Sequence, residues 1–291
     1  MDSMLIIRPP SEAHSLLLPL TIGCSHNRCT FCPTYKGLSF RIRSIDEVKN
    51  DIDQASKSLG GRVTRVFLEN GDALVCRQSM LVEVLQHLNA RFPNLERTAT
   101  YASPQNPLHK SLDELAKLRE LGLKMVYLGV ETGDEELLKK VDKGVTRSQM
   151  VEAARKLKEA GMILSVTILL GLGGKEGSRR HALETAGILS EIDPDYCGAL
   201  TLMIERPAPI YDEWQRGEFV PLQTFEYLEE LREIVAHSEL TNCFFTSNHA
   251  SNYLPLRLRL PQQKEEGLQL LEKVLASRDA RALRPEHLRA L

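Results

Sequence analysis

The chain has 291 residues, a formal net charge of −2, 42% hydrophobic residues and six cysteines. This length suits one α/β barrel, and the apolar content is sufficient for a large core. The near-neutral charge disfavours non-specific binding of nucleic acid, and six cysteines in a chain of this length do not indicate a disulfide scaffold.

The N-terminal segment has an early acid, Asp2, and no long apolar stretch. We therefore do not expect it to be a signal peptide. No apolar run in the sequence reaches the length needed to span a membrane. These features predict a protein of the reducing cytoplasm, with no membrane partner.

Short apolar runs alternate with amphipathic stretches from about residue 18 to residue 240. The apolar runs predict strands at 18–23, 64–68, 97–102, 125–130, 162–170 and 196–203. The amphipathic stretches predict helices at 45–59, 79–89, 111–121, 134–142, 147–160, 178–191 and 222–236, with another near 262–277. Strand–helix units in regular succession predict parallel strands with right-handed crossovers.

This order is compatible with an open doubly wound sheet or a barrel, and six units rather than eight favour an incomplete barrel. We expect an α/β fold, a partial (β/α)6 TIM-like barrel over residues 1–240. Residues 241–291 are expected to form a small C-terminal extension packed on it. The ligand site is expected at the carboxyl ends of the strands, where the polar and glycine-rich segments fall.

Three cysteines, Cys24, Cys29 and Cys32, follow the first predicted strand with the spacing C-x4-C-x2-C. Three nearby thiolates can hold three irons of a [4Fe–4S] cube and leave the fourth open to another ligand. A structural zinc site normally requires four protein ligands, and here only His26 lies nearby as a fourth. The other three cysteines are scattered singly, at Cys76, Cys197 and Cys243. Spacing therefore favours an open iron–sulfur site over zinc.

The cysteine segment resembles that of the radical S-adenosylmethionine (SAM) enzymes, with one residue more in the first loop than the commonest C-x3-C-x2-C pattern. Residues 18–205 are similar to the barrel shared by the elongator catalytic subunit, the methylthiotransferases and coproporphyrinogen dehydrogenase. The resemblance implies a [4Fe–4S] cluster held by the three cysteines, with SAM on the open iron. It also places Phe31 near the SAM adenine, although an ordinary core phenylalanine would look the same.

Three strand ends carry further candidates for binding SAM. Gly71 lets the backbone come close to a ligand and Asp72 can accept hydrogen bonds from an ammonium group, although Asn-Gly-Asp is also a common turn. The resemblance implies that this segment contacts the methionyl amino group. Glu131 lies in Gly-Val-Glu-Thr-Gly-Asp, which is similar to a signature of the same group, and is expected to contact the ribose. Asp134 is predicted to cap the next helix.

Gly171 and Gly173 follow the fifth predicted strand in a segment that is neither a P-loop nor a dinucleotide fingerprint. The resemblance places this segment along the adenine, and packing alone is the alternative. The polar stretch 246–253 includes His249 and Tyr253, which we take as candidate catalytic residues. A histidine in such a loop can equally serve to secure the backbone.

The resemblance predicts an enzyme that cleaves SAM reductively to a 5′-deoxyadenosyl radical, which abstracts hydrogen from the substrate. A small-molecule substrate is favoured and nucleic acid disfavoured, because the charge is near neutral. A one-electron donor such as flavodoxin or ferredoxin is expected. The alternatives are a tRNA-modifying enzyme of the same superfamily and a non-catalytic iron–sulfur electron carrier. A regulatory barrel with structural zinc also stays open.

Overall fold

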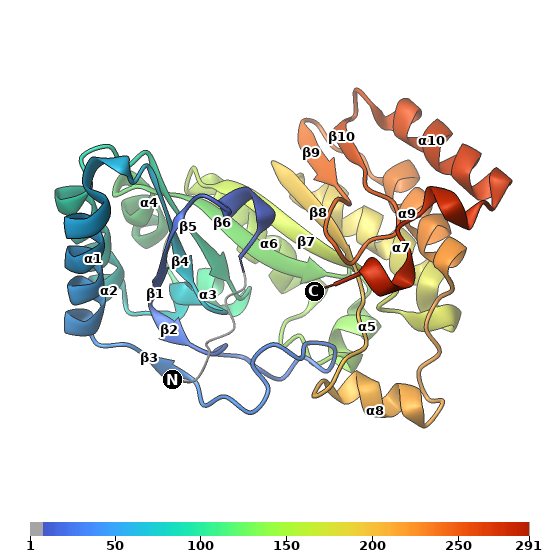
Figure 1. The fold of residues 1–291 in the computed structure, drawn as a ribbon, viewed down its shortest axis with the longest axis horizontal. Coiled ribbons are helices and arrows are strands. Elements are labelled where there is room, and N and C mark those ends of the chain that lie inside the picture. Colours follow the sequence, from blue (N-terminus) through green and yellow to red (C-terminus); the bar gives the residue numbers. More distant parts are fainter. Residues whose placement is uncertain (1–7, 291) are drawn as a thin grey trace. The chain divides into compact units, whose positions relative to one another are not determined.

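The computed structural model describes residues 8–290, which divide into two compact units (Figure 1). The first unit contains residues 8–27, 34–128 and 152–164, and the second contains 28–33, 129–151 and 165–290. The start of the chain, where we expect no signal peptide, lies outside the described residues. Within residues 8–290, no helix is both long and apolar enough to cross a membrane. The predicted division at residue 240 stays a prediction.

The first unit is built on parallel strands that pair in the order β1, β4, β5, β6. These are β1 (Leu16–Pro19), β4 (Arg65–Glu69), β5 (Arg97–Ala102) and β6 (Leu123–Glu131), the last of which continues into the second unit. The helices α1 (Ile45–Leu59), α2 (Gln78–Arg91) and α4 (Leu112–Glu120) lie on one side of them (Figure 1). The short α3 (Gln105–His109) follows β5, and α6 (Arg147–Glu159) begins in the second unit.

Two of these helices begin as their sequences dictate. Ser44 and Glu47 form a capping box at α1, and Ser111 and Glu114 form another at α4. In each box the serine hydroxyl accepts from the backbone N–H three residues later, and the glutamate accepts from the serine N–H. These contacts satisfy backbone donors that have no partner inside the helix. The helix predicted at 111–121 thus begins with one of these boxes.

The second unit pairs β7 (Ile163–Leu170), β8 (Tyr196–Thr201), β9 (Cys243–Thr246) and β10 (Arg257–Leu260) in that order, and β7 begins in the first unit. The first two pairings are parallel and the last is antiparallel. The helices of this unit are α5 (Glu135–Lys140), α7 (Gly174–Ile192), α8 (Pro209–Gln215), α9 (Thr224–His237) and α10 (Lys264–Ser277). Helix α9 packs against both α7 and α10.

All six predicted strands are present, as β1, β4, β5, β6, β7 and β8. The first differs in extent, because the chain leaves the parallel sheet after Pro19. It then forms β2 (Thr21–Ile22), which pairs antiparallel with β3 (Arg41–Ile42). The cysteine segment therefore starts from a small ribbon rather than directly from a sheet strand. Short 3-10 helices occupy Pro10–Glu12, Gly60–Arg62, Ala73–Val75, Ala280–Ala282 and Glu286–Leu288.

One face of the first unit's sheet is packed with alternate residues of its strands. The buried members are Phe67, Ala99, Met125 and Tyr127, with Leu17 and Tyr101 packed against them. Glu12 is fully buried beside this cluster. Its carboxylate accepts from Tyr127 Oη at 2.7 Å and from Ser15 Oγ at 2.5 Å, and pairs with Arg97 at 2.5 Å. The buried charge of Glu12 is tolerated here because both of its carboxylate oxygens are engaged.

Replacing Glu12 with Gln should lower the free energy of unfolding by about 3 kcal/mol, because it leaves the Arg97 guanidinium without its buried counter-charge. Urea unfolding followed by circular dichroism would measure the change. Glu83→Gln is the matched control, since Glu83 pairs with Lys49 at the surface, where loss of the pair costs less than about 1 kcal/mol. An equal effect of the two substitutions would contradict the prediction.

Candidate functional site

The cysteine loop is held by backbone contacts within each unit. Cys24 belongs to the first unit, whereas Cys29 and Cys32 belong to the second. In the second unit, Thr30 N donates to Val141 O and Ile210 N donates to Thr30 O, both at 3.0 Å. All six cysteines are free of disulfides, and the three in the loop are partly exposed whereas the other three are buried. The loop thiols are thus the reachable ones.

The turn after β4 comes so close to the cysteine loop that it requires glycine. A Cβ on Gly71 would lie 2.7 Å from Cys24 Cβ and 3.0 Å from Tyr35 Cε2. Gly71 N also donates to Gly23 O at 3.3 Å. The preceding Asn70 has a φ of 74°, and its buried Nδ2 has no hydrogen-bond partner among the described residues. An unpaired donor at this strand end suits a ligand that presents an acceptor.

Asp72 is buried, and both of its carboxylate oxygens are engaged. Oδ2 accepts from Ser25 Oγ at 2.6 Å and from Asn106 Nδ2, while Oδ1 accepts from Ser103 N at 3.2 Å. Burial raises the pKa of this carboxyl to about 7, against the opposing effect of these hydrogen bonds. Asp72 therefore ties the residue after Cys24 to the loop that follows β5. Its predicted role as an acceptor for an ammonium group stays a prediction.

In the second unit, Phe31 and a lysine lie beside the two later cysteines. Phe31 packs against a cluster that includes Val141 and Ile210, and Lys143 Nζ lies 5.9 Å from its ring centroid. Lys143 is buried and pairs with Glu131 at 2.9 Å. Burial alone would lower the pKa of Lys143, but Glu131, Cys29 and Cys32 raise it on balance. A fixed cation beside two cysteines suits an anionic cluster and an anionic ligand group.

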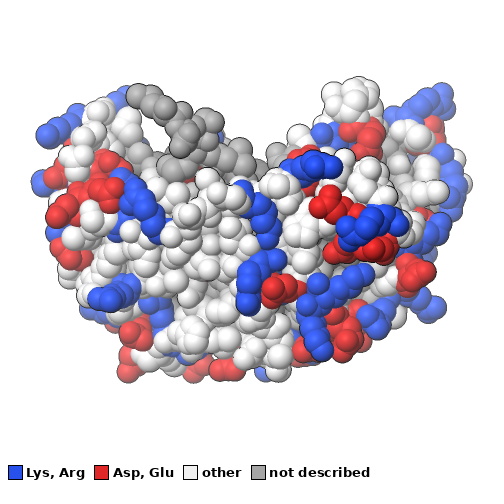
Figure 2. All heavy atoms as spheres, turned by 90° about the horizontal axis from the view of Figure 1, so that it is seen from below, with Lys and Arg blue, Asp and Glu red and all other residues white. Residues whose placement is uncertain are grey.

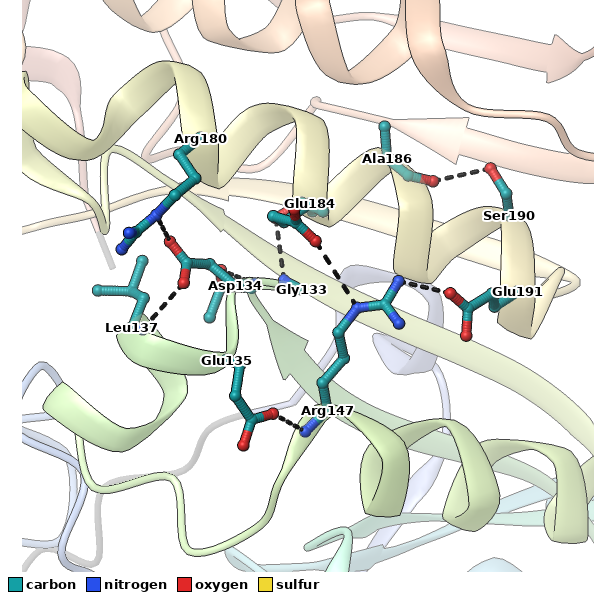
Figure 3. A network of polar contacts seen from close by, with 12 residues as sticks. Gly133, Asp134, Glu135, Leu137, Arg147, Arg180, Glu184, Ala186, Ser190 and Glu191 are labelled. Carbon is teal, nitrogen blue, oxygen red and sulfur yellow. Dashed lines mark hydrogen bonds and ion pairs between the residues drawn. The ribbon is translucent and has the colours of Figure 1, made fainter.

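The segment that carries Glu131 packs against α7, which holds it in place (Figure 3). A Cβ on Gly133 would lie 2.0 Å from Glu184 O, and Gly133 N donates to Thr185 Oγ1 at 3.1 Å. Asp134 caps α5 as predicted, accepting from the N–H groups of Glu136 and Leu137.

Arg180 of α7 binds this segment, and Arg147, at the start of α6 (Arg147–Glu159), links Glu135 after the segment to α7. Arg180 donates to Asp134 Oδ2 at 2.6 Å, and Arg147 pairs with Glu191 at 2.6 Å (Figure 3). With the turn held on both sides, Glu131 adopts a φ of 64°, a conformation that non-glycine residues rarely take. The residues of the Gly-Val-Glu-Thr-Gly-Asp signature therefore have two different roles. Its last three residues anchor the turn, and Glu131 is left to meet Lys143.

Both glycines after β7 have a packing role. Gly171 has a φ of 81°, and a Cβ there would lie 2.2 Å from Tyr227 Cε1. Gly171 N donates to the buried Glu230 at 2.5 Å, and burial raises the pKa of that carboxyl. A Cβ on Gly173 would lie 3.0 Å from Gly177 C. The packing alternative thus has a physical basis, and the predicted adenine contact stays a prediction.

The loop that contains His249 and Tyr253 is pinned by the C-terminal arginines. Arg284 donates to the carbonyls of His249, Ala250 and Asn252 at 2.7–2.9 Å.

The two candidate catalytic side chains are themselves engaged. His249 Nδ1 accepts from Ser251 N at 3.2 Å, and burial together with Arg284 lowers the pKa of the imidazole. Tyr253 Oη donates to Glu286 at 2.5 Å and accepts from Arg289 at 2.6 Å, and burial raises its pKa to about 12. These contacts support the alternative that His249 and Tyr253 serve to hold the loop backbone in place. Their predicted catalytic roles stay predictions.

Within residues 8–290, no three His, Cys, Asp or Glu side chains gather closely enough to hold a single metal ion. The thiolate ligands of a cubane are bound to separate irons and do not converge on one ion. In the second unit, Cys29 and Cys32 with Lys143 beside them suit a group of this kind.

The comparison with known families decides the superfamily. Residues 18–186 match the profile of the Radical SAM superfamily. The chain belongs to this superfamily. It is an enzyme of radical chemistry whose cofactors are a [4Fe–4S] cluster and SAM.

Curated relatives are distant and longer. The chain is 24% identical over 71% of its length to a tRNA uridine(34) acetyltransferase of Methanocaldococcus infernus, covering 46% of that protein. It is 22% identical over 73% of its length to the heme chaperone HemW of Bacillus subtilis, covering 56% of it. It is 28% identical over 58% of its length to a tRNA-2-methylthio-N(6)-dimethylallyladenosine synthase of Methylacidiphilum infernorum, covering 38% of it. The chain thus spans about half the length or less of these relatives.

Solved structures share the fold. Methylornithine synthase matches 78% of this chain and 63% of its own, with a TM-score of 0.55 and 20% identity. Coproporphyrinogen III oxidase from Escherichia coli, a radical SAM enzyme, matches 76% and 51%, with a TM-score of 0.56 and 17% identity. These neighbours confirm the predicted α/β fold with a partial TIM-like barrel.

Two features of the site were missed in the sequence. Lys143 was not among the predicted site residues, because its proximity to Cys29 and Cys32 could not be inferred from spacing. The Ser25–Asp72–Asn106 tether was also missed, because its members come from three separate segments. The presence of a polar residue after each of three strands was the available signal.

Replacing Gly71 with Ala should lower the iron content of the anaerobically reconstituted protein, because the new Cβ displaces the loop at Cys24. Iron and sulfide per chain, with the visible absorbance of the cluster, measure this. Gly177→Ala is the control, since a Cβ there meets nothing within 4 Å. Full iron loading of Gly71→Ala would contradict the prediction.

Asp72 should make the stability of the metal-free protein depend on pH. An ordinary Asp has a pKa of 3.8, whereas Asp72 has a pKa of about 7, so the folded state holds one more proton between these values. The contribution of Asp72 to stability is therefore present below pH 3.8 and is lost as the pH rises to about 7. Wild type should lose stability relative to Asp72→Asn over this range in urea titrations. Parallel pH profiles would count against this assignment.

Proposed function

We propose that Cys24, Cys29 and Cys32 hold the [4Fe–4S] cluster, and that this chain acts on a small-molecule substrate. The observation that carries the proposal is the three-cysteine loop inside the matched region, with Lys143 beside two of its members. When bound, the reduced cluster and SAM supply a 5′-deoxyadenosyl radical, which takes a hydrogen atom from the substrate.

The chain's own residues supply binding and orientation. The Lys143 ammonium is suited to the SAM carboxylate, and Glu131 to the ribose hydroxyls, because both are held by packing and by each other. The unpaired Asn70 amide offers a further donor. Phe31 is proposed to face the adenine, as the superfamily resemblance implies. A one-electron donor such as flavodoxin or ferredoxin is proposed as the reductant, and the cytoplasm as the location.

A small substrate is favoured by charge. The net charge is −2. On the face that Figure 2 shows, basic and acidic side chains of the described residues are intermingled. Binding to a nucleic-acid backbone depends on clustered Lys and Arg.

Modification of tRNA is the second candidate. Two of the relatives described above are named for modifications of tRNA, so the expectation that nucleic acid is not a partner lacks support from the comparisons. These relatives are much longer than the matched region, and their substrates do not transfer with it.

Under anaerobic conditions with SAM and dithionite, the reconstituted protein should form 5′-deoxyadenosine and methionine. Cys29→Ala should reduce this product by at least about a thousandfold, because it removes a cluster ligand. Cys197→Ala is the matched control, since Cys197 is a buried thiol outside the loop.

A four-iron cluster that binds no SAM would refute the proposal and favour the electron carrier, and zinc without iron would favour the regulatory barrel. Binding of tRNA that weakens steeply with salt would favour tRNA modification over a small substrate.

A further inference from the structure

The sheet of the first unit carries two buried carboxylates on its packed face. The carboxylate of Glu12 has protein partners, because it contacts Arg97, Tyr127 and Ser15. Glu69 is the last residue of β4, two positions after the buried Phe67. Side chains two apart on a strand share a face, so Glu69 lies on the Phe67 side at the carboxyl end of the strand.

Glu69 lacks the contacts that Glu12 has. Its side chain is only 3% exposed, and no hydrogen bond or ion pair joins its carboxylate to another of residues 8–290. The Glu69 oxygens are nevertheless not among the fully buried unpaired atoms, so they keep a small opening to their surroundings. Burial raises its pKa, and the charge of Arg8 only partly opposes this. A carboxylate largely shielded from water and without a protein partner is unfavourable unless a ligand satisfies it.

An aromatic surface lies next to Glu69 on the same face. The Tyr101 ring packs edge-on to Phe67 at 5.0 Å and to Tyr127 at 5.9 Å. Phe67 and Tyr127 are 5.8 Å apart, also edge-on. The β4–β5 register pairs Leu68 with Thr100, which sets Glu69 beside Tyr101. The Tyr101 hydroxyl makes no hydrogen bond among the described residues, and burial, with nearby Tyr35, Tyr127 and Glu69, raises its pKa.

We propose that Glu69 and Tyr101 bind the substrate, and that the substrate carries a positively charged nitrogen next to an apolar or planar group. This rests on the proposed function. The nitrogen pairs with the Glu69 carboxylate, and the apolar part contacts the partly exposed Tyr101 ring, which packs edge-on to the buried Phe67 and Tyr127 rings. Glu69, which has no protein partner at the end of its strand, is thus proposed to select a cationic substrate. Glu12, on the same face, is bound by protein side chains and has a structural role.

The first test uses the metal-free protein without any ligand. Glu69→Gln should leave the melting temperature unchanged or raise it, because it removes an unmatched buried charge. Glu12→Gln, on the same face, should lower it. A fall with Glu69→Gln as large as that with Glu12→Gln would show that Glu69 is a structural carboxylate and would overturn the proposal.

The second test uses phenethylammonium as the probe and 2-phenylethanol as its uncharged counterpart, with binding followed by ligand-detected NMR. Wild type should bind the cation about tenfold more tightly than the alcohol, as one charge-assisted hydrogen bond implies. Glu69→Gln should abolish this preference, and the exposed control Glu47→Gln should retain it. No binding of the cation, or equal binding of both compounds, would overturn the proposal.

The competing possibility is that Glu69 serves the ammonium group of SAM itself. Saturating SAM should leave phenethylammonium bound to the reconstituted wild type, and displacement of the probe by SAM would overturn the proposal. The NMR comparison needs neither cluster nor turnover. A protein that forms no 5′-deoxyadenosine therefore refutes the proposed function without deciding whether Glu69 selects a cation, and the two failures are distinguishable.

Discussion

The close approach of two backbones at Gly71 and Cys24 constrains the rest of the first unit's site. Because a Cβ at position 71 would lie only 2.7 Å from Cys24 Cβ, this position can hold only glycine unless the cysteine loop moves. The conformation and burial of the two neighbouring residues follow from this close approach. Asn70 takes a positive φ to bring the chain there, and Asp72 is buried so that its carboxylate can hold Ser25. Burying a carboxylate is costly, and three hydrogen bonds offset that cost only in part, which is why its pKa is raised.

The second unit uses the same arrangement at the end of β6. Gly133 allows α7 to approach, and Glu131 takes a positive φ beside it. Residues held in sparsely populated conformations cost about 1–3 kcal/mol and persist only where surrounding contacts impose them. Here the imposing contacts are the Thr185 hydroxyl, the Arg180–Asp134 pair and the α5 cap. At both strand ends, a glycine lets another segment pack closely against the turn. A polar residue one or two positions before that glycine, Asn70 or Glu131, then takes a positive φ.

Local signals in the sequence predicted local features well. Hydrophobic runs located the six parallel strands, and Asp134 was recognised as a cap because capping depends on neighbours three or fewer positions away. Strands β9 and β10 were missed. They are four residues each and lie beside a segment dominated by hydrogen-bonding side chains. In β10 exposed arginines alternate with buried leucines, whereas in β9 partly buried positions alternate with buried ones. The partners of Asp72 and of Lys143 could not be predicted, because they depend on contacts between segments far apart in the chain.

The contacts of Arg284 have a consequence for the order of folding during synthesis. The carbonyls of His249, Ala250 and Asn252 all accept hydrogen bonds from this one guanidinium, and Arg289 reaches Ser251 O and Tyr253. Chains emerge from the ribosome N-terminus first, so these carbonyls are made more than thirty positions before their donors. The loop therefore stays solvated and without these donors until Arg284 and Arg289 have been synthesised and have left the ribosome. Ordering of the 249–253 loop is then delayed relative to the strands that precede it.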